Sequence, residues 1–118
     1  MRKRVIEDYL QDLLDSIDAI EEFIADISVD DFKQDRKTIF AVIRAIEIIG
    51  EAVKNIPEST ISKYPNVPWR AIAGMRDKLI HHYFSVDINV LWETTQQDVP
   101  QLKVLLTRVM KDLETEET

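Results

Sequence analysis

The sequence predicts an all-α fold in which one domain, residues 1–118, forms a bundle of four to five helices, two of them long and antiparallel. Three observations support this. Apolar residues recur every three or four positions along most of the chain. The 118 residues include only two glycines and four prolines, too few for the tight turns of a β-sandwich. Cysteine is absent, which excludes disulfide scaffolds, thiolate zinc sites and cysteine nucleophiles.

The first 27 residues predict a long amphipathic helix of roughly six turns. Aspartate and glutamate fill most positions between its apolar residues. Residues 28–31 follow as a turn that contains helix-capping side chains, beginning with Ser28. The apolar positions are Val5, Ile6, Tyr9, Leu10, Leu13, Leu14, Ile17, Ile20, Ile24 and Ile27.

A second long helix is predicted from about Asp35 to Asn55, and Pro57 stops it. The opposite side of this helix is not uniformly polar, because Phe40 and Ile48 lie there among charged residues. These two residues are either isolated surface apolar groups, which are common, or a second contact face in a dimer or against another protein. The main apolar face consists of Ile39, Val42, Ile43, Ile46, Ile49 and Val53.

The middle of the chain predicts a short turn and a third helix. Glu58–Tyr64 forms at most one helical turn, and Pro65 and Pro68 break any helix that passes through them. Pro68 suits the first turn of a new helix, where its missing N–H costs little. We expect this third helix to continue to about Tyr83.

The C-terminal part predicts a fourth helix capped by Asp87, with an apolar run over residues 90–92. The helical pattern restarts at Asp98 and Pro100 and gives the fifth helix. Residues 114–118 are expected to form a flexible tail. The last apolar stripe consists of Leu102, Leu105, Leu106, Val109 and Leu113.

Composition and charge exclude several functions. The chain has 15 basic and 22 acidic residues, a net charge of −7, which disfavours unaided binding of phosphate backbones. When the chain is divided into residues 1–56, 57–83 and 84–118, only the middle stretch has a net positive charge, +2, and both histidines lie there. No Gly-rich loop is present, which excludes a Walker phosphate loop and a dinucleotide fingerprint. The absence of a signal-peptide pattern or an apolar run of membrane-spanning length predicts a cytoplasmic protein with no membrane contact.

Arg76 lies in the middle of the apolar face of the predicted third helix. A guanidinium in that position needs an acidic partner, a route to solvent or a chemical role. One interpretation is an ion pair with a carboxylate of the second helix, such as Glu47. The apolar face itself consists of Trp69, Ile72, Ala73, Leu79, Ile80 and Tyr83.

His81 is the other candidate for chemistry. Asp77, four residues earlier, is placed to orient its ring and favour its charged form, although most such surface pairs have no function. In an ideal helix His81 and Arg76 do not converge, so either the helix loosens near its end or a second copy of the segment completes the site. His81 and His82 point about 100° apart on a helix and share no metal ion, so no metal site is predicted.

The segment resembles a known family of ribonucleases. Residues 76–81 match the R-x4-H motif of HEPN-domain ribonucleases, and residues 81–83 extend it to the R-x4-H-x-Y form of the HepT-like toxins. The Val-Pro-Trp of residues 67–69, the Gly-Met-Arg of residues 74–76 and residues 44–52 of the second helix are similar to the same subfamily. The resemblance covers about residues 5–112.

The resemblance implies a HEPN-like helical bundle that forms a homodimer, with two R-x4-H motifs in one interface cleft. It implies a metal-independent endoribonuclease, without a cofactor, that leaves a 2′,3′-cyclic phosphate on RNA such as tRNA or mRNA. His81 is then the acid–base group and Arg76 stabilises charge on the phosphorane, with Asp77, Arg44 and Glu47 in supporting positions.

The resemblance also implies a toxin–antitoxin system in which a minimal nucleotidyltransferase antitoxin neutralises the ribonuclease by adding AMP to Tyr83. Judged by its position alone, Tyr83 is an aromatic residue at the edge of the core. Two other functions remain open. The protein is alternatively a non-catalytic helical dimer that binds a nucleotidyltransferase, or a structural bundle in which Arg76 is paired with a glutamate.

Overall fold

A computed structural model of the chain describes residues 3–82 and 85–117, with the backbone alone at residues 3–4, 80–82, 85 and 117. It confirms the predicted all-α architecture and adds one short pair of strands. The helices are α1 (Lys3–Ile24), α2 (Val29–Gln34), α3 (Arg36–Val53), α4 (Glu58–Ile61), α5 (Trp69–Ala73), α6 (Met75–Leu79), α7 (Ile88–Glu93) and α8 (Val99–Glu117). A π-helical turn, η1 (Thr94–Asp98), joins the last two, and the strands are β1 (Ile80–His82) and β2 (Ser85–Val86).

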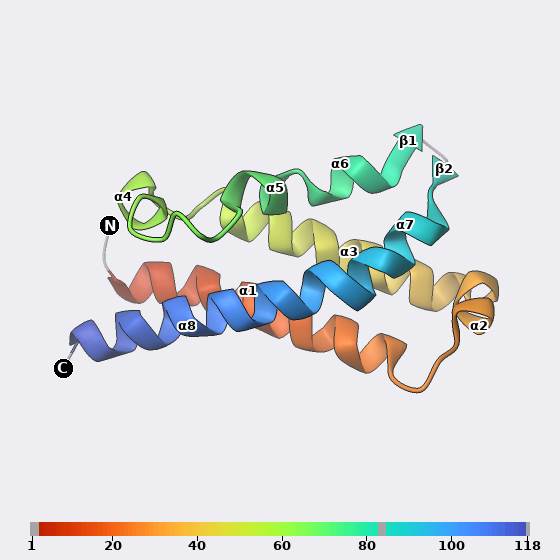
Figure 1. Cartoon of the computed structure of the whole chain (residues 1–118), viewed down its shortest axis with the longest axis horizontal. Helices are drawn as coiled ribbons and strands as arrows, with labels where there is room; N and C mark the ends of the chain where they lie inside the picture. The colour runs from red at the N-terminus through yellow and green to blue at the C-terminus, as the bar shows by residue number, and fades with distance from the viewer. Residues whose placement is uncertain (1–2, 83–84, 118) are drawn as a thin grey trace.

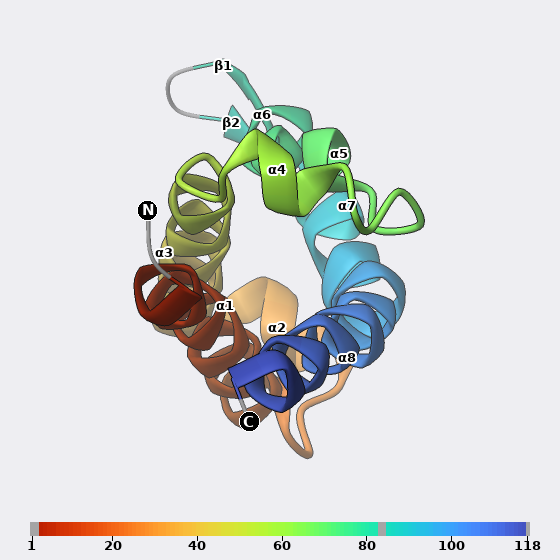
Figure 2. The ribbon, with the colours of Figure 1, turned by 90° about the vertical axis from the view of Figure 1, so that its left-hand side faces the viewer.

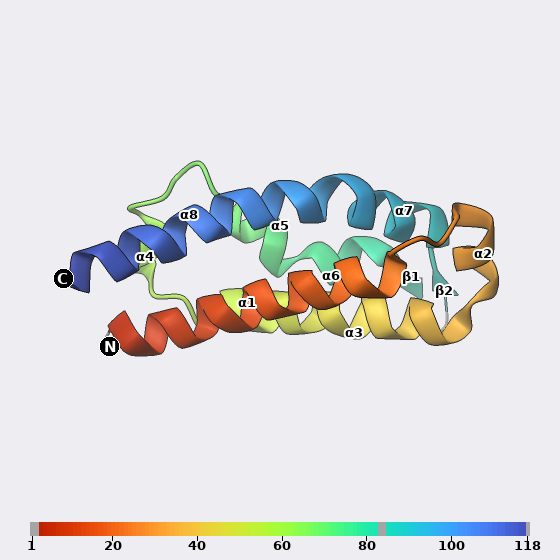
Figure 3. The same cartoon turned by 90° about the horizontal axis from the view of Figure 1, so that it is seen from below.

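The three long helices lie side by side along the molecule (Figures 1 and 3). α1 and α3 are antiparallel and share the largest helix–helix contact, as the sequence predicts, and α8 packs on α1. Seen end-on in Figure 2, these helices and the α5–α7 segment surround a common core. The molecule is elongated, with extents of 47 × 29 × 21 Å. Within the described residues, no helix is both long and apolar enough to span a membrane.

Leucine and isoleucine side chains of α1 form one wall of the core. Leu10, Leu13, Ile17 and Ile20 are completely buried, and their spacing of three or four residues aligns them on one helical face. The helix ends at Ile24, about one turn earlier than predicted, because Asp26 turns the chain with a left-handed φ of 60°.

Two capped turns lead from α1 into α3. The hydroxyl oxygen of Ser28 accepts a hydrogen bond from the backbone N–H of Asp31 at 3.1 Å, which starts α2 where the sequence predicted only a turn. Asp35 then ends α2 and caps α3, since its carboxylate accepts bonds from the N–H and the hydroxyl of Thr38. The predicted start of the second long helix at Asp35 is therefore confirmed.

The prediction of one continuous third helix over residues 68 to about 83 is wrong. The helix breaks at Gly74 into α5 and α6, and α6 ends at Leu79. The chain then continues as β1, which pairs antiparallel with β2 through Ile80 and Val86. The carbonyl of Leu79 accepts a hydrogen bond from the N–H of Asp87, so pairing with a later segment replaces the helical bonds.

The last two predicted helices are joined rather than separate. Asp87 caps α7 as predicted, with its carboxylate accepting a bond from the N–H of Val90. However, the helical backbone continues through η1, where the N–H of Val99 bonds to the carbonyl of Thr94, five residues earlier. Pro100 accounts for this wider turn, because it has no N–H and its ring clashes with a carbonyl four residues before it. Residues 114–117, expected to form a tail, are helical in α8.

Candidate functional site

Arg76 lies on the surface of α6 and is paired with α3. Its Nε donates a hydrogen bond to Oε2 of Glu47 at 2.8 Å, which confirms the predicted ion pair with that carboxylate. The Arg76 side chain is 47% exposed. Its predicted position within the apolar face is therefore wrong, because the break at Gly74 turns Met75 toward the core instead, while Leu79 is buried as predicted.

The close approach of α5 to α3 sets this pairing. A Cβ atom on Gly50 of α3 would lie 3.3 Å from the carbonyl oxygen of Ala73, the last residue of α5. Glycine at this position therefore lets the two backbones come together. Since α6 begins two residues after Ala73, the contact brings Arg76 next to Glu47, one turn before Gly50 on α3.

Arg76 and Glu47 belong to a small network of charges. Arg44 approaches Glu47 at 3.8 Å and Glu51 at 4.0 Å, while an Nη atom of Arg76 lies 3.7 Å from the carboxylate of Asp77. The network borders a surface hollow of about 260 Å³. This hollow is lined by Glu47, Gly50, Glu51, Lys54, Ala73, Arg76 and Asp77.

The geometry holds the guanidinium by one edge. Nε is bonded to Glu47 and one Nη lies 3.7 Å from the carboxylate of Asp77, while the side chain as a whole is 47% exposed. A guanidinium presents its donors in a planar fork that suits two oxygens of a phosphate. The site therefore offers a fixed cation to an anionic ligand at the surface.

His81 lies in β1, beyond the end of α6. The helical spacing assumed between Asp77 and His81 is therefore wrong, although a contact between their side chains stays a prediction. The early end of the helix is one of the two arrangements suggested for bringing Arg76 and His81 together. Asp77 itself is 83% exposed. Tyr83 lies outside the described residues, between β1 and β2.

Phe40 and Ile48, the predicted second face of α3, differ in their surroundings. Phe40 is 59% exposed, with the guanidinium of Arg36 5.8 Å from its ring centroid, whereas Ile48 is half-buried within the protein. Among the described residues, no group of three or more His, Cys, Asp and Glu side chains has an arrangement that holds a metal ion.

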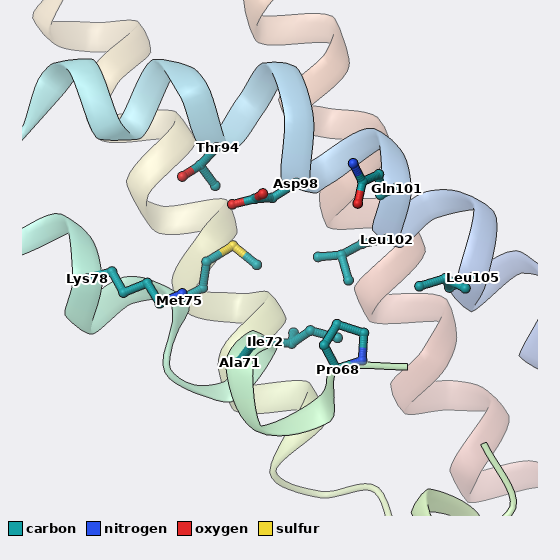
Figure 4. A pocket seen from close by; sticks show the side chains of 10 residues that line it. All are labelled: Pro68, Ala71, Ile72, Met75, Lys78, Thr94, Asp98, Gln101, Leu102 and Leu105. Carbon is teal, nitrogen blue, oxygen red and sulfur yellow. The ribbon is translucent and has the colours of Figure 1, made fainter. Parts of the chain in front are cut away.

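A second hollow of about 160 Å³ lies on the other side of α6, between the α5–α6 segment and η1–α8 (Figure 4). Met75, Ile72 and Leu102 give it apolar walls, while Lys78 and Asp98 add charges. Its full lining is Pro68, Ala71, Ile72, Met75, Lys78, Thr94, Asp98, Gln101, Leu102 and Leu105. The sequence did not predict this hollow, since it joins segments that lie on either side of the β1–β2 strands and no local motif marks it.

Comparisons with known proteins identify a family. A family model described as ribonuclease HepT-like matches residues 13–109. A protein of Thermococcus cleftensis named probable ribonuclease HepT is 53% identical over 109 residues, which cover 92% of this chain and 99% of the relative.

Two proteins of Methanocaldococcus jannaschii, each named a putative RNase, are also similar over nearly the whole chain. One is 44% identical over 117 residues, covering 99% of this chain and 97% of the relative. The other is 45% identical over 114 residues, which cover 97% of this chain and 98% of the relative. No solved structure matches the chain at a significant level.

Proposed function

This chain belongs to the HepT-like ribonuclease family, and we propose that it is an endoribonuclease that cleaves RNA without a metal ion through Arg76 and His81. The observation that carries the proposal is the position of Arg76. Its guanidinium is half-exposed, bonded through Nε to Glu47, and one turn before the strand that contains His81.

The proposed reaction uses the RNA itself as the nucleophile. The 2′-hydroxyl attacks the adjacent phosphorus, a base takes its proton, and the bond from phosphorus to the 5′-oxygen breaks. The 5′-oxygen receives a proton and leaves as a hydroxyl, and a 2′,3′-cyclic phosphate remains. His81 transfers the protons, and Arg76 stabilises the negative charge that builds up on the phosphorane oxygens.

Asp77, Arg44 and Glu47 support this chemistry in the proposal. Glu47 orients Arg76, and Arg44 approaches Glu47 from the same helix. We propose that Asp77 orients His81, an effect smaller than loss of the histidine itself. The chain forms a homodimer in this proposal, with two copies of the motif facing one cleft.

Cleavage of total tRNA tests the catalytic assignment. Arg76→Ala and His81→Ala are each expected to lower the rate by about 10²–10⁴-fold, and EDTA should leave the parent rate unchanged. His82→Ala and Arg70→Ala are matched controls, because they remove a neighbouring histidine and an exposed arginine of α5. Activity that survives His81→Ala, or that EDTA abolishes, contradicts the proposal.

We further propose that the chain is the toxin of a toxin–antitoxin pair in the cytoplasm. A minimal nucleotidyltransferase antitoxin adds AMP to Tyr83, and the added phosphate competes with RNA for the cations of the site. Intact mass after co-expression with the nucleotidyltransferase should show added AMP on the parent and none on Tyr83→Phe. Modification of Tyr83→Phe to the same extent would place the acceptor elsewhere.

The second candidate is a non-catalytic helical partner of a nucleotidyltransferase. The exposed Phe40 on α3 is the observation that favours it. A parent protein that binds the nucleotidyltransferase stably and cleaves no RNA would establish this function instead.

A further inference from the structure

The first half of α3 combines positive charge with an exposed aromatic ring. Arg36, Lys37 and Arg44 are exposed, and the sequence from 36 to 46 contains no acidic residue. At the end of this surface, Arg44 approaches the carboxylates of Glu47 at 3.8 Å and Glu51 at 4.0 Å, whereas Arg36 and Lys37 lie further from them. Phe40 lies between these basic residues and is 59% exposed, more than Phe23 at 41%. In a chain with a net charge of −7, this surface is a local exception.

The acidic residue that precedes this surface is engaged elsewhere. The carboxylate of Asp35 accepts hydrogen bonds from the N–H of Thr38 at 3.1 Å and from its hydroxyl at 2.7 Å. These bonds hold it against the first turn of α3. The guanidinium of Arg36 lies over the Phe40 ring, 5.8 Å from its centroid and near the outer limit of a cation–π contact.

The surface lies in line with the candidate catalytic residues. Arg36, Phe40, Arg44 and Glu47 are three or four residues apart and share one side of α3. Since Glu47 is bonded to Arg76, this side of the helix is the one next to α6. Phe40 lies seven residues before Glu47, which is about 10 Å along the helix axis.

The segment that contains His81 lies at the same end of the molecule as the beginning of α3. α6 runs back along α3 toward the first turns of that helix, and β1 lies at the end of the molecule where α3 begins (Figures 1 and 3). The strand that contains His81 and the turns that contain Arg36 and Phe40 are therefore at one end. A chain that leaves the Arg76–His81 region in this direction passes Phe40.

We propose that Arg36, Phe40 and Arg44 form a binding site for single-stranded RNA, with one base stacked on the Phe40 ring and phosphates beside the two arginines. The site rests on the proposed ribonuclease function and specifies its substrate as unpaired RNA. An aromatic ring stacks on any exposed base, whereas a duplex keeps its bases stacked on one another and withholds them.

Charge favours RNA over a second copy of the chain at this surface. A two-fold contact centred on Phe40 would place Arg36 and Lys37 near the same residues of the partner, and like charges repel. The phosphates of RNA carry the complementary charge. A contact between copies at Phe40 is therefore the competing outcome of the test.

Binding is measured in a His81→Ala background, so that cleavage does not consume the probe. The probes are a fluorescently labelled single-stranded RNA oligonucleotide and the same sequence as a duplex, followed by fluorescence anisotropy. Phe40→Ala should weaken single-strand binding by about fivefold to more than a hundredfold, the range expected for loss of one base–aromatic stack. Phe40→Trp should retain it.

Two further variants separate stacking from charge and from general effects. Arg36→Ala should lower the salt dependence of binding by about one phosphate contact. Phe23→Ala, which removes another exposed phenylalanine from α1, should bind RNA as the background protein does. Quenching of a 2-aminopurine base in the oligonucleotide should accompany binding and disappear in Phe40→Ala.

The outcomes distinguish this inference from the proposed function. Unchanged single-strand binding by Phe40→Ala overturns the inference, as does a change in oligomeric state caused by that variant. If the parent cleaves RNA but binding does not depend on Phe40, the proposed ribonuclease function is supported and the proposed binding site is contradicted. If binding depends on Phe40 but the parent cleaves no RNA, the proposed binding site is supported and the proposed catalysis is contradicted.

Discussion

Arg76 is hydrogen-bonded to the carboxylate of Glu47, whereas the carboxylate of Asp77 is more distant, at 3.7 Å. Glu47 accepts the Nε hydrogen bond at 2.8 Å, and Glu47 is in turn approached by Arg44. Because the Nε edge is occupied, the direction of the Nη groups follows from the position of Glu47 on α3. In the proposed mechanism, Glu47 is therefore a positioning residue whose effect on cleavage passes through Arg76.

Substitution of Glu47 tests this role. Glu47→Ala should lower the rate of RNA cleavage by about tenfold to a hundredfold, because a reacting group that moves by about 1 Å loses up to that factor. Glu47→Gln should restore most of the rate, since the amide oxygen still accepts a bond from Nε. The measurement is kcat and KM on one RNA, with Glu51→Ala as the control for a lost surface carboxylate.

A rise in cleavage rate in Glu47→Ala would contradict the positioning role. It would mean that the carboxylate competes with phosphate for Arg76 rather than orienting the guanidinium. An equal loss in Glu47→Gln and Glu47→Ala would show that charge, rather than the hydrogen bond, is what matters.

At the residue scale, the sequence predicted the partner of Arg76 but not its exposure. The pairing with Glu47 was deducible because a guanidinium near apolar residues needs a carboxylate. The exposure was not, because the helical wheel assumed one helix through Gly74. With that helix divided, Met75 takes the inward position and Arg76 the outward one.

At the scale of elements, the carboxylate of Asp35 links the stability of α3 to pH. Hydrogen bonds from the hydroxyl and the N–H of Thr38 lower the pKa of Asp35 below its ordinary value of 3.8. A carboxyl with a lowered pKa in the folded state contributes stability above its unfolded pKa and loses it as the pH falls through the folded pKa.

Thermal unfolding checks this link. The melting temperature of Asp35→Ala should lie below that of the parent at neutral pH, and the difference should shrink as the pH falls below about 4. Asp12→Ala, on the exposed face of α1, is the control. A difference that stays constant from neutral pH to about pH 3 would show that the charge of Asp35 contributes nothing.

The contact of α5 with α3 predicts a strong size limit at Gly50. Gly50→Leu should lower the free energy of unfolding by about 1–3 kcal/mol, because the backbone carbonyl of Ala73 faces the new side chain. It should also lower RNA cleavage, since α6 moves with α5. Urea unfolding and the cleavage assay measure the two effects.

Gly74→Ala is the matched control for Gly50. A Cβ atom at Gly74 would lie 3.6 Å from the carbonyl oxygen of Arg70, an ordinary contact distance, so this variant should keep stability and activity. Equal stability of Gly50→Leu and the parent would mean that the approach of the two helices does not constrain the site.

Helix beginnings could be predicted from the sequence, whereas the last elements of the candidate site could not. Asp35 and Asp87 cap the backbone a few residues ahead, so their effect is local and can be deduced from the sequence. Ser28 was also identified as a capping residue, but the short helix that it begins was expected to be only a turn. The pairing of Ile80 with Val86 depends on where the chain returns. Pro100 indicated a new helix, but a wider turn satisfies the same backbone constraint without ending the old one.

At the scale of the whole molecule, the proposed homodimer is tested by its mass. Light scattering at micromolar concentration should give twice the mass of the chain, because the proposed cleft needs two motifs. Phe40→Ala should keep the dimer, since we assign that surface to RNA. If the parent has the mass of a monomer under these conditions, the proposed homodimer is contradicted.

The elongated shape of the protomer affects how it moves through a gel-filtration column. Its radius of gyration is 14.9 Å, whereas a compact chain of this length is expected to have about 13.5 Å. Three long helices laid side by side produce this excess. An elongated particle has a larger hydrodynamic radius than a sphere of equal mass, so even a monomer elutes ahead of globular standards and mimics a heavier species.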